Sequence, residues 1–258
     1  MLLLSIANML SFSISTKPRV YGAAASVGSD ALYVLGGYVN SGISGTMFQY
    51  HPSTDKWSTH PRPMNVPRWG LGAVATNGSI YAVGGHDQHG YSSTVERYDI
   101  RNNKWSIVSS MPTARAFLAV AEYNCRVYAI GGVAGNNEPK DETVVEVYVT
   151  STDKWYQLSS RSLSQAVSHM TAIHYTGPNE ALLVIGGSYQ SNKVRLIQQV
   201  GHACDANHLP TENSFGLLTC SICAPVRRFA REYVPYVACL PFHPNLTLAI
   251  GTLWFAML

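Results

Sequence analysis

The stretch SIYAVGG at residues 79–85 decides the fold, because the chain repeats it at nearly regular intervals. The related stretches read ALYVLGG, RVYAIGG and ALLVIGG, and the first glycines of successive copies are 48, 47 and 55 residues apart. A period of this length is typical of repeat architectures, in which each unit buries its apolar face against the next. The four glycine pairs are Gly36 and Gly37, Gly84 and Gly85, Gly131 and Gly132, and Gly186 and Gly187.

A second marker follows the first three glycine pairs in the same register. In each copy a Tyr is followed seven residues later by a Trp, and a Lys precedes that Trp. Agreement of this kind over three copies excludes chance, and large rings can fill the wedge between adjacent repeats. The pairs are Tyr50 and Trp57, Tyr98 and Trp105, and Tyr148 and Trp155.

One copy carries the signals of four short antiparallel strands. Two apolar runs, 70–76 and 79–83, flank Asn-Gly at 77–78, which is a strong two-residue turn signal. A polar loop at 86–93 leads to an alternating run at 94–100, and a second turn leads to an outer strand that begins with Lys104. Four antiparallel strands in about 48 residues make one blade of a β-propeller.

The phrases VERYDIRNNKW (95–105) and MPTARAFLAVAEYNCRVYAIGG (111–132) resemble the kelch repeat, and most closely the kelch domains of BTB–kelch proteins. The resemblance implies an all-β fold, an incomplete kelch β-propeller with three clear four-stranded blades and a partial fourth. We expect an irregular lead at 1–17 and a divergent, unassigned tail at 201–258. The predicted repeats fill 18–200, with blades at 18–64, 65–112 and 113–160 and the partial blade at 161–200.

Three to four blades are fewer than a closed ring normally needs, and the BTB and BACK modules of the kelch-like family are missing. Two interpretations remain open. The favoured one is a fragment of a longer kelch protein, and the other is a short protein whose tail supplies more strands. An open arc leaves an unpaired blade edge, which predicts a tendency to self-associate.

The resemblance also places candidate partner-binding residues at the mouth of the propeller. An arginine opens the first strand of each copy, and in the kelch-like family such arginines can bind acidic peptides, which suits bidentate pairing with carboxylates. The alternative is that they stabilise backbone carbonyls or turns. Loops between the second and third strands carry further candidates. The predicted partner-binding set is Arg19, Arg68, Arg115, Tyr38, His86, His89 and Tyr91.

Composition narrows the function classes. The net charge is +3 and charged residues make up 13%, so we expect neither a nucleic-acid nor a membrane partner. The apolar start, 1–15, lacks a basic n-region, so a signal peptide is not favoured and we expect a cytoplasmic protein. No catalytic set is visible, so we expect no enzyme, no cofactor and no metal. His202, Cys204, Cys220 and Cys223 have the types of a zinc set, but their spacing argues against one.

By resemblance, the chain is expected to bind a protein or peptide client, an acidic one if the arginines bind it. The function implied is substrate recognition for a cullin-RING ubiquitin ligase adaptor. The alternatives are an actin-binding kelch protein and a non-functional fragment.

Overall fold

The computed structural model describes residues 18–135, 137–159, 162–175, 181–190, 192–194 and 196–202. All regular elements in these ranges are β-strands. The predicted lead at 1–17 and nearly all of the predicted tail, including Cys204, Cys220 and Cys223, lie outside them. None of the described elements is a helix able to cross a membrane.

Three four-stranded antiparallel sheets form blades 1 to 3, as the repeat predicts. Blade 1 contains β1 (Ala23–Val27), β2 (Ala31–Leu35), β5 (Met47–His51) and β6 (Lys56–Ser58). Blade 2 contains β7 (Gly72–Thr76), β8 (Ser79–Val83), β11 (Val95–Asp99) and β12 (Lys104–Val108). Blade 3 contains β14 (Ala119–Tyr123), β15 (Arg126–Ile130), β18 (Val145–Val149) and β19 (Lys154–Gln157).

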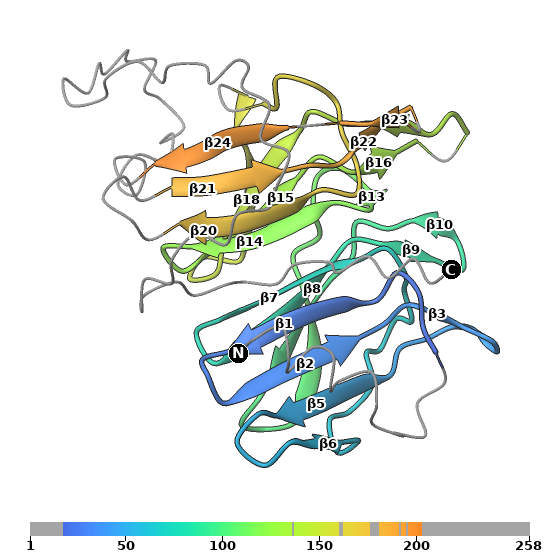
Figure 1. Cartoon of the computed structure of the whole chain (residues 1–258), viewed down its shortest axis with the longest axis vertical. Coiled ribbons are helices and arrows are strands. Elements are labelled where there is room, and N and C mark those ends of the chain that lie inside the picture. Colours follow the sequence, from blue (N-terminus) through green and yellow to red (C-terminus); the bar gives the residue numbers. More distant parts are fainter. Residues whose placement is uncertain are drawn as a thin grey trace, which may run out of the picture.

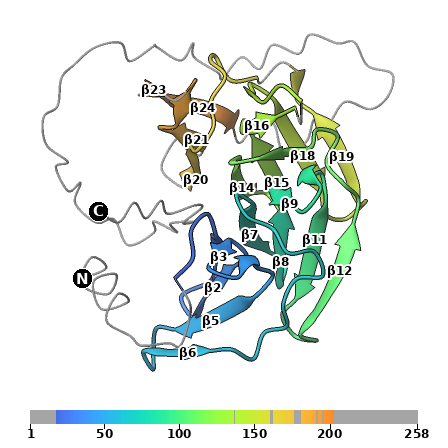
Figure 2. The same ribbon diagram turned by 90° about the vertical axis from the view of Figure 1, so that its right-hand side faces the viewer.

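Blade 4 has three strands in the described part of the chain: β20 (Thr171–Tyr175), β21 (Ala181–Ile185) and β24 (Ile197–His202). The third strand lies at the end of the predicted partial blade at 161–200 and continues two residues beyond it. Its pairing with β21 shifts register between Leu182 and Leu183, which marks a β-bulge. The four blades follow one another around an arc, with blades 1 and 4 at its two ends (Figure 2).

The glycine pairs allow each blade to approach the next. Gly84 has a φ of +60°, and a Cβ added there would lie 2.6 Å from the carbonyl oxygen of Arg115 in blade 3. Gly36 and Gly131 meet the backbone of the following blade in the same way, at 2.6 and 2.7 Å. Gly186 ends the last described blade, and no described atom lies within 4 Å of the position of its Cβ. The glycines are therefore required by close backbone contact as well as by positive φ.

The aromatic pairs fill the outer part of each wedge, as predicted. Tyr98 and Trp105 have ring centroids 5.1 Å apart, and Tyr98 also contacts Tyr33 of blade 1 at 6.2 Å. The Tyr98 hydroxyl donates to Oδ1 of Asn103, and that same oxygen accepts from the amide of Arg62 in the segment entering blade 2. Burial, with Tyr33 and Asp99 nearby, raises the pKa of Tyr98 to about 12.

The tryptophans also hydrogen-bond the segment that leads into a blade. Trp105 Nε1 donates to Arg62 O and Trp155 Nε1 to Ser109 O, both at 2.8 Å. Trp57 is the corresponding residue of blade 1, and its Nε1 is buried with no hydrogen-bond partner in the described part of the chain. In blades 2 and 3 the matching N–H binds the segment that arrives from the preceding blade, so in blade 1 this hydrogen-bond donor is left unsatisfied by the described residues.

Two glycines test the packing between blades. Gly84→Ala and Gly186→Ala both place a side chain at positive φ, which costs about 1–2 kcal/mol. Only Gly84→Ala also forces Cβ against the backbone of the next blade, and such overpacking adds roughly 1–3 kcal/mol. We expect Gly84→Ala to lower the free energy of unfolding in urea at least twice as much. Equal losses would show that the glycine pairs serve only the local turn.

Candidate protein-binding face

Short hairpins project from one end of every blade (Figure 1). They follow the glycine pairs, so each lies between the second and third long strand of its blade, where the sequence predicts loops. The hairpin strands are β3 (Tyr38–Val39) with β4 (Gly42–Ile43), β9 (His86–Asp87) with β10 (Gly90–Tyr91), β16 (Val133–Ala134) with β17 (Lys140–Asp141), and β22 (Ser188–Tyr189) with β23 (Asn192–Lys193). We call this face of the arc, which carries the hairpins of all four blades, the mouth.

A chain of backbone hydrogen bonds joins the blades at the mouth. The amide of Gly70 donates to Tyr21 O at 2.8 Å, Phe117 N to Gly70 O at 2.7 Å, and His169 N to Phe117 O at 2.8 Å. All four residues have φ between 55° and 61°. They occupy the same position in their repeats, just before the first long strand of each blade. The rings of Tyr21, Phe117 and His169, which share this unusual conformation, contact one another in sequence. In blade 2 the position is taken by Gly70, which follows Trp69.

Aromatic rings and imidazoles gather where these residues meet the hairpins. Trp69 lies at the centre, with ring centroids 5.4 Å from Tyr21, 5.4 Å from Phe117 and 5.0 Å from His86. Three more contacts extend the group: Tyr38 to Trp69 at 6.3 Å, Tyr91 to His86 at 5.3 Å, and His169 to Phe117 at 4.2 Å. We call this set the mouth cluster: Tyr21, Tyr38, Trp69, His86, Tyr91, Phe117 and His169.

The mouth cluster remains accessible. Tyr21 is 39% exposed and Tyr38 is 48% exposed, and Val20 beside them is 46% exposed. The other members are partly exposed. Large exposed apolar residues gathered in one place on a soluble fold are typical of an interaction surface, whereas single ones are not. The mouth therefore has the character of a protein-binding site.

The structure contradicts the prediction that Arg68 and Arg115 contact a partner. Both side chains are fully buried. Arg68 Nη1 donates to Gly84 O at 2.8 Å and to Thr94 O at 2.6 Å, while Nη2 lies 3.0 Å from Oε2 of Glu96. Burial lowers the pKa of the Arg68 guanidinium, and Glu96 opposes that shift. The structural alternative, in which the arginines stabilise carbonyls, is the one that the geometry supports.

The same buried pair recurs in blade 3. Arg115 Nη2 lies 2.9 Å from Oε2 of Glu146, and it also donates to Ala129 O. Glu146 accepts a hydrogen bond from Thr113, just as Glu96 accepts from the amide of Asn65. Each pair thus ties the segment that enters its blade to the middle of that blade. An ion pair this deep costs much desolvation, and the additional hydrogen bonds offset only part of that cost. Arg68 Nε, Arg115 Nε and Arg115 Nη1 are buried with no hydrogen-bond partner in the described part of the chain.

The end blades replace the ion pair. In blade 1 Arg19 is half-buried, donates to Gly36 O at 2.8 Å, and lies 4.6 Å from the ring centroid of Phe48, which occupies the position of the glutamate. In blade 4 the corresponding residues are Val167 and Gln198, and Gln198 Oε1 accepts from the amide of Ser164 at 2.8 Å. Blade 4 therefore lacks both charges of the ion pair, but its Gln198 still accepts a hydrogen bond from the segment that enters the blade, as Glu96 does in blade 2.

The predicted loop residues divide into two groups. Tyr38, His86 and Tyr91 belong to the mouth cluster, whereas His89 is exposed and its amide donates to Oδ1 of Asp87 at 2.7 Å. Sequence reasoning missed the other four members of the cluster. They stand one or two residues after the repeated arginine position, so the repeat alignment itself contained the signal. Those members are Tyr21, Trp69, Phe117 and His169.

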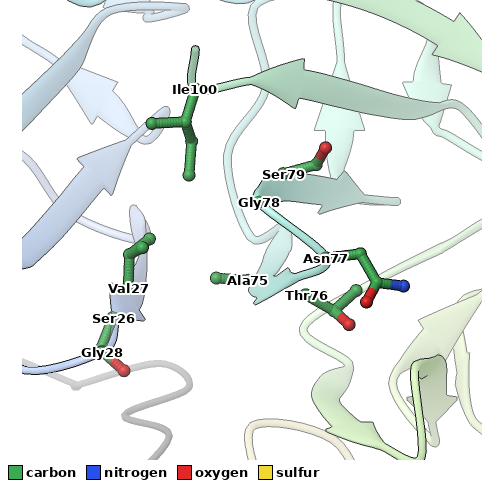
Figure 3. A pocket seen from close by; sticks show the side chains of 9 residues that line it. All are labelled: Ser26, Val27, Gly28, Ala75, Thr76, Asn77, Gly78, Ser79 and Ile100. Atoms are coloured by element: carbon green, nitrogen blue, oxygen red, sulfur yellow. The ribbon is translucent and has the colours of Figure 1, made fainter.

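On the face of the arc opposite the mouth, the described residues form a small hollow between blades 1 and 2. This hollow of about 200 Å³ lies between the turns of the two blades, lined by Ser26, Thr76 and Asn77 among other small or apolar residues (Figure 3). No charged side chain lines it. Within the described ranges, no three His, Cys, Asp or Glu side chains gather into a group that could hold a metal.

Residues 13–208 match the KLHDC2/KLHL20/DRC7 kelch-repeats domain, which is most of the chain. The chain belongs to the kelch-repeat family. Its sheets agree with that assignment, because each clear repeat forms one four-stranded antiparallel blade. No curated protein matches the chain. Kelch-repeat domains are protein–protein interaction modules, and the accessible mouth cluster gives this one a surface for that role.

The buried ion pair can be tested against the solution found in blade 4. Arg68→Val leaves Glu96 charged and buried, so we expect it to lower the free energy of unfolding by about 3–5 kcal/mol. Adding Glu96→Gln reproduces the Val and Gln of blade 4 and removes the unpaired charge. The double variant should recover at least 1 kcal/mol of that loss in urea denaturation. If Glu96→Gln makes Arg68→Val less stable, the pairing is not what Glu96 is needed for.

Proposed function

We propose that this kelch-repeat chain recognises a protein client through its mouth cluster, without catalysing a reaction on it. The observation that carries the proposal is the accessible aromatic surface around Trp69, held by backbone hydrogen bonds between four blades. Aromatic residues dominate the energetic centres of protein interfaces, because they bury much area with few rotatable bonds. A rigid scaffold that presents such a surface at loop hairpins suits recognition.

We further propose that the client is recruited for ubiquitination, as the substrate of a cullin-RING ligase adaptor. This finer role is supported by the likeness of the repeats at 95–105 and 111–132 to those of BTB–kelch proteins. Delivery of a client would require a cullin-binding module from a partner or from a longer chain.

The mouth can be tested with a matched pair of surface variants. Tyr38→Ser removes a ring that is 48% exposed in the mouth, and Ile107→Ser removes an apolar side chain that is 63% exposed on β12. Neither change opens a core cavity. Tyr38→Ser should capture proteins that bind through the mouth at least about fivefold less than the unmodified chain does, as loss of a hot-spot contact implies. Ile107→Ser should capture them as well as the unmodified chain does.

Quantitative mass spectrometry of the captured proteins gives the readout, with circular dichroism to confirm that both variants fold. A client set that is unchanged in Tyr38→Ser, or reduced equally in both variants, would contradict binding at the mouth. Actin co-sedimentation of the unmodified chain separates the cytoskeletal alternative, since actin would then be the captured protein.

The adaptor role makes a separate prediction about the client. Silencing this chain in cells should lengthen the half-life of a mouth-dependent client, and re-expression of the unmodified chain, but not of Tyr38→Ser, should shorten it again. A cycloheximide chase of the client measures this directly. A client that is captured through the mouth but keeps the same half-life in all conditions would leave recognition intact and reject the ubiquitination role.

A further inference from the structure

We propose that the mouth cluster receives the cationic side chain of an arginine or lysine in the client, with Asp87 and Asp141 as its counter-charges. This inference rests on the proposed function, because it assigns a chemistry to the ligand of that face. It replaces the acidic client expected from the arginine positions.

The rings supply the first part of the argument. A cation within about 6 Å of a ring centroid is attracted by the negative face of the ring, and tryptophan is the strongest partner. Trp69 stands at the centre of the cluster, while Tyr21 and Tyr38 present the most exposed rings beside it. Several rings of this kind from three blades converge on one accessible place, which a single cationic side chain could contact together.

The charges at the mouth supply the second part. The hairpin of blade 1 carries no charged residue, and acidic residues outnumber basic ones in the described hairpin segments 86–91, 133–142 and 188–193. Lys140 lies 3.7 Å from Oε1 of Glu142, so its charge is partly answered within the loop. The acidic residues are Asp87, Glu138, Asp141 and Glu142, and the basic ones are Lys140 and Lys193.

Two of these carboxylates lie close enough to influence the cluster and the residue beneath it. Burial raises the pKa of Tyr91, and Asp141 raises it further. Asp141 also opposes the lowering of the pKa of His169 that burial causes. Asp87 acts in the same sense on Arg68, which burial otherwise shifts downward. The negative potential of Asp141 therefore extends to two members of the mouth cluster, Tyr91 and His169, and that of Asp87 extends to Arg68 beneath the cluster.

Both carboxylates are also held in place. Asp141 Oδ2 accepts from the amide of Gln190 in the hairpin of blade 4 at 2.8 Å, and Asp87 Oδ1 accepts from His89 N. They belong to different blades: Asp141 lies in the hairpin of blade 3, and Asp87 lies in the hairpin of blade 2 beside His86, whose ring contacts Trp69. Aromatic faces flanked by fixed carboxylates are suited to a cation rather than to an anion.

The buried arginines complete the argument. An acidic client would need free guanidinium groups, but the charges of Arg68 and Arg115 are answered inside the blades by Glu96 and Glu146. Arg19 has no carboxylate partner among the described residues, but it is half-buried and directed at Gly36 O, Thr46 Oγ1 and the Phe48 ring. A carboxylate arriving at the mouth would instead meet Asp87, Asp141 and their acidic neighbours. Electrostatic complementarity of this kind selects partners and excludes others by repulsion.

The test uses three capped peptides that differ only at two positions: Gly-Ser-Arg-Gly-Arg-Ser-Gly, the same peptide with glutamate for both arginines, and the same with norleucine. Nitrogen–proton NMR spectra of the whole chain at pH 7.5 follow the indole signals during titration. We expect the arginine peptide alone to shift the Trp69 indole, and its affinity to fall as salt is raised.

Two variants assign the binding to its parts. Trp69→Leu, which lacks the indole signal and is followed by its backbone amide signals instead, should weaken binding of the arginine peptide by about three- to tenfold, as loss of a cation–π contact implies. Asp87→Asn, a partly exposed change that keeps the size of the side chain, should weaken it also, while Ile107→Ser should leave it unchanged. Asp87→Asn keeps the test valid if Trp69→Leu fails to fold.

The outcomes separate this inference from the proposed function. If the glutamate or norleucine peptide shifts the Trp69 indole as strongly, or if no peptide shifts it, the cationic preference is overturned. The proposed function fails instead if client capture is unchanged in Tyr38→Ser, or is reduced equally in Tyr38→Ser and Ile107→Ser. If the arginine peptide binds with equal affinity to the unmodified chain and to Asp87→Asn, the counter-charge assigned to Asp87 is wrong.

Discussion

Close contact between backbones of neighbouring blades is the constraint on which the structure depends. The first glycine of a pair lies so near the next blade that a Cβ would meet a carbonyl oxygen at 2.6–2.7 Å in three of the four copies. The second glycine of the pair uses the contact: Gly85 N donates to Arg115 O at 2.9 Å, and Gly37 N to Arg68 O at 2.8 Å. Arg68 and Arg115 thus each use the backbone carbonyl to contact the preceding blade and the guanidinium to bind groups inside their own blade.

This contact explains why the repeated arginines are structural. The backbone of Arg68 is fixed against blade 1, and its side chain reaches between the strands of blade 2 to carbonyls at Gly84 and Thr94 and to Glu96. A guanidinium used in this way cannot also reach a client. What the arrangement gives to function lies further along the chain. Two residues after the arginine position of each repeat, Tyr21, Gly70, Phe117 and His169 turn at positive φ and hydrogen-bond from blade to blade. Trp69, which precedes Gly70, contacts the rings of Tyr21 and Phe117 at this surface.

The repeat made the fold predictable from sequence. SIYAVGG and its copies, the Asn77-Gly78 turn and the spaced Tyr and Trp fix strand order, hairpin position and the wedge packing, and all of these appear in blades 1 to 3. The strand limits of blade 4 were less predictable. It lacks the Tyr–Trp pair, and a bulge interrupts the pairing of its third strand opposite Leu182 and Leu183.

The binding face was predictable only in part. The position of the loops predicted Tyr38, His86 and Tyr91 as binding residues, because the hairpins that follow the glycine pairs all lie on the same face of the arc. Residue type misled for Arg68 and Arg115, since an arginine near a mouth can point inward as readily as outward. Only the register of Glu96 and Glu146 on the third strands, facing the arginines across the blade, decides between the two. Trp69 and Phe117 were missed because a ring next to a strand is usually a core residue. The positive φ of Gly70 and Phe117, on which the contact between blades at the mouth depends, is a three-dimensional property.

Native-state hydrogen exchange of the amides of Gly85, Phe117 and His169 tests the central claim most directly. These residues lie outside the long strands of the blades, and their amides are hydrogen-bonded only if successive blades are in backbone contact. The account predicts that all three exchange slowly, with protection close to that of the buried strand β8. Exchange at the rate of exposed loop amides would show that the blades do not meet at the mouth, and would remove the basis for the aromatic surface.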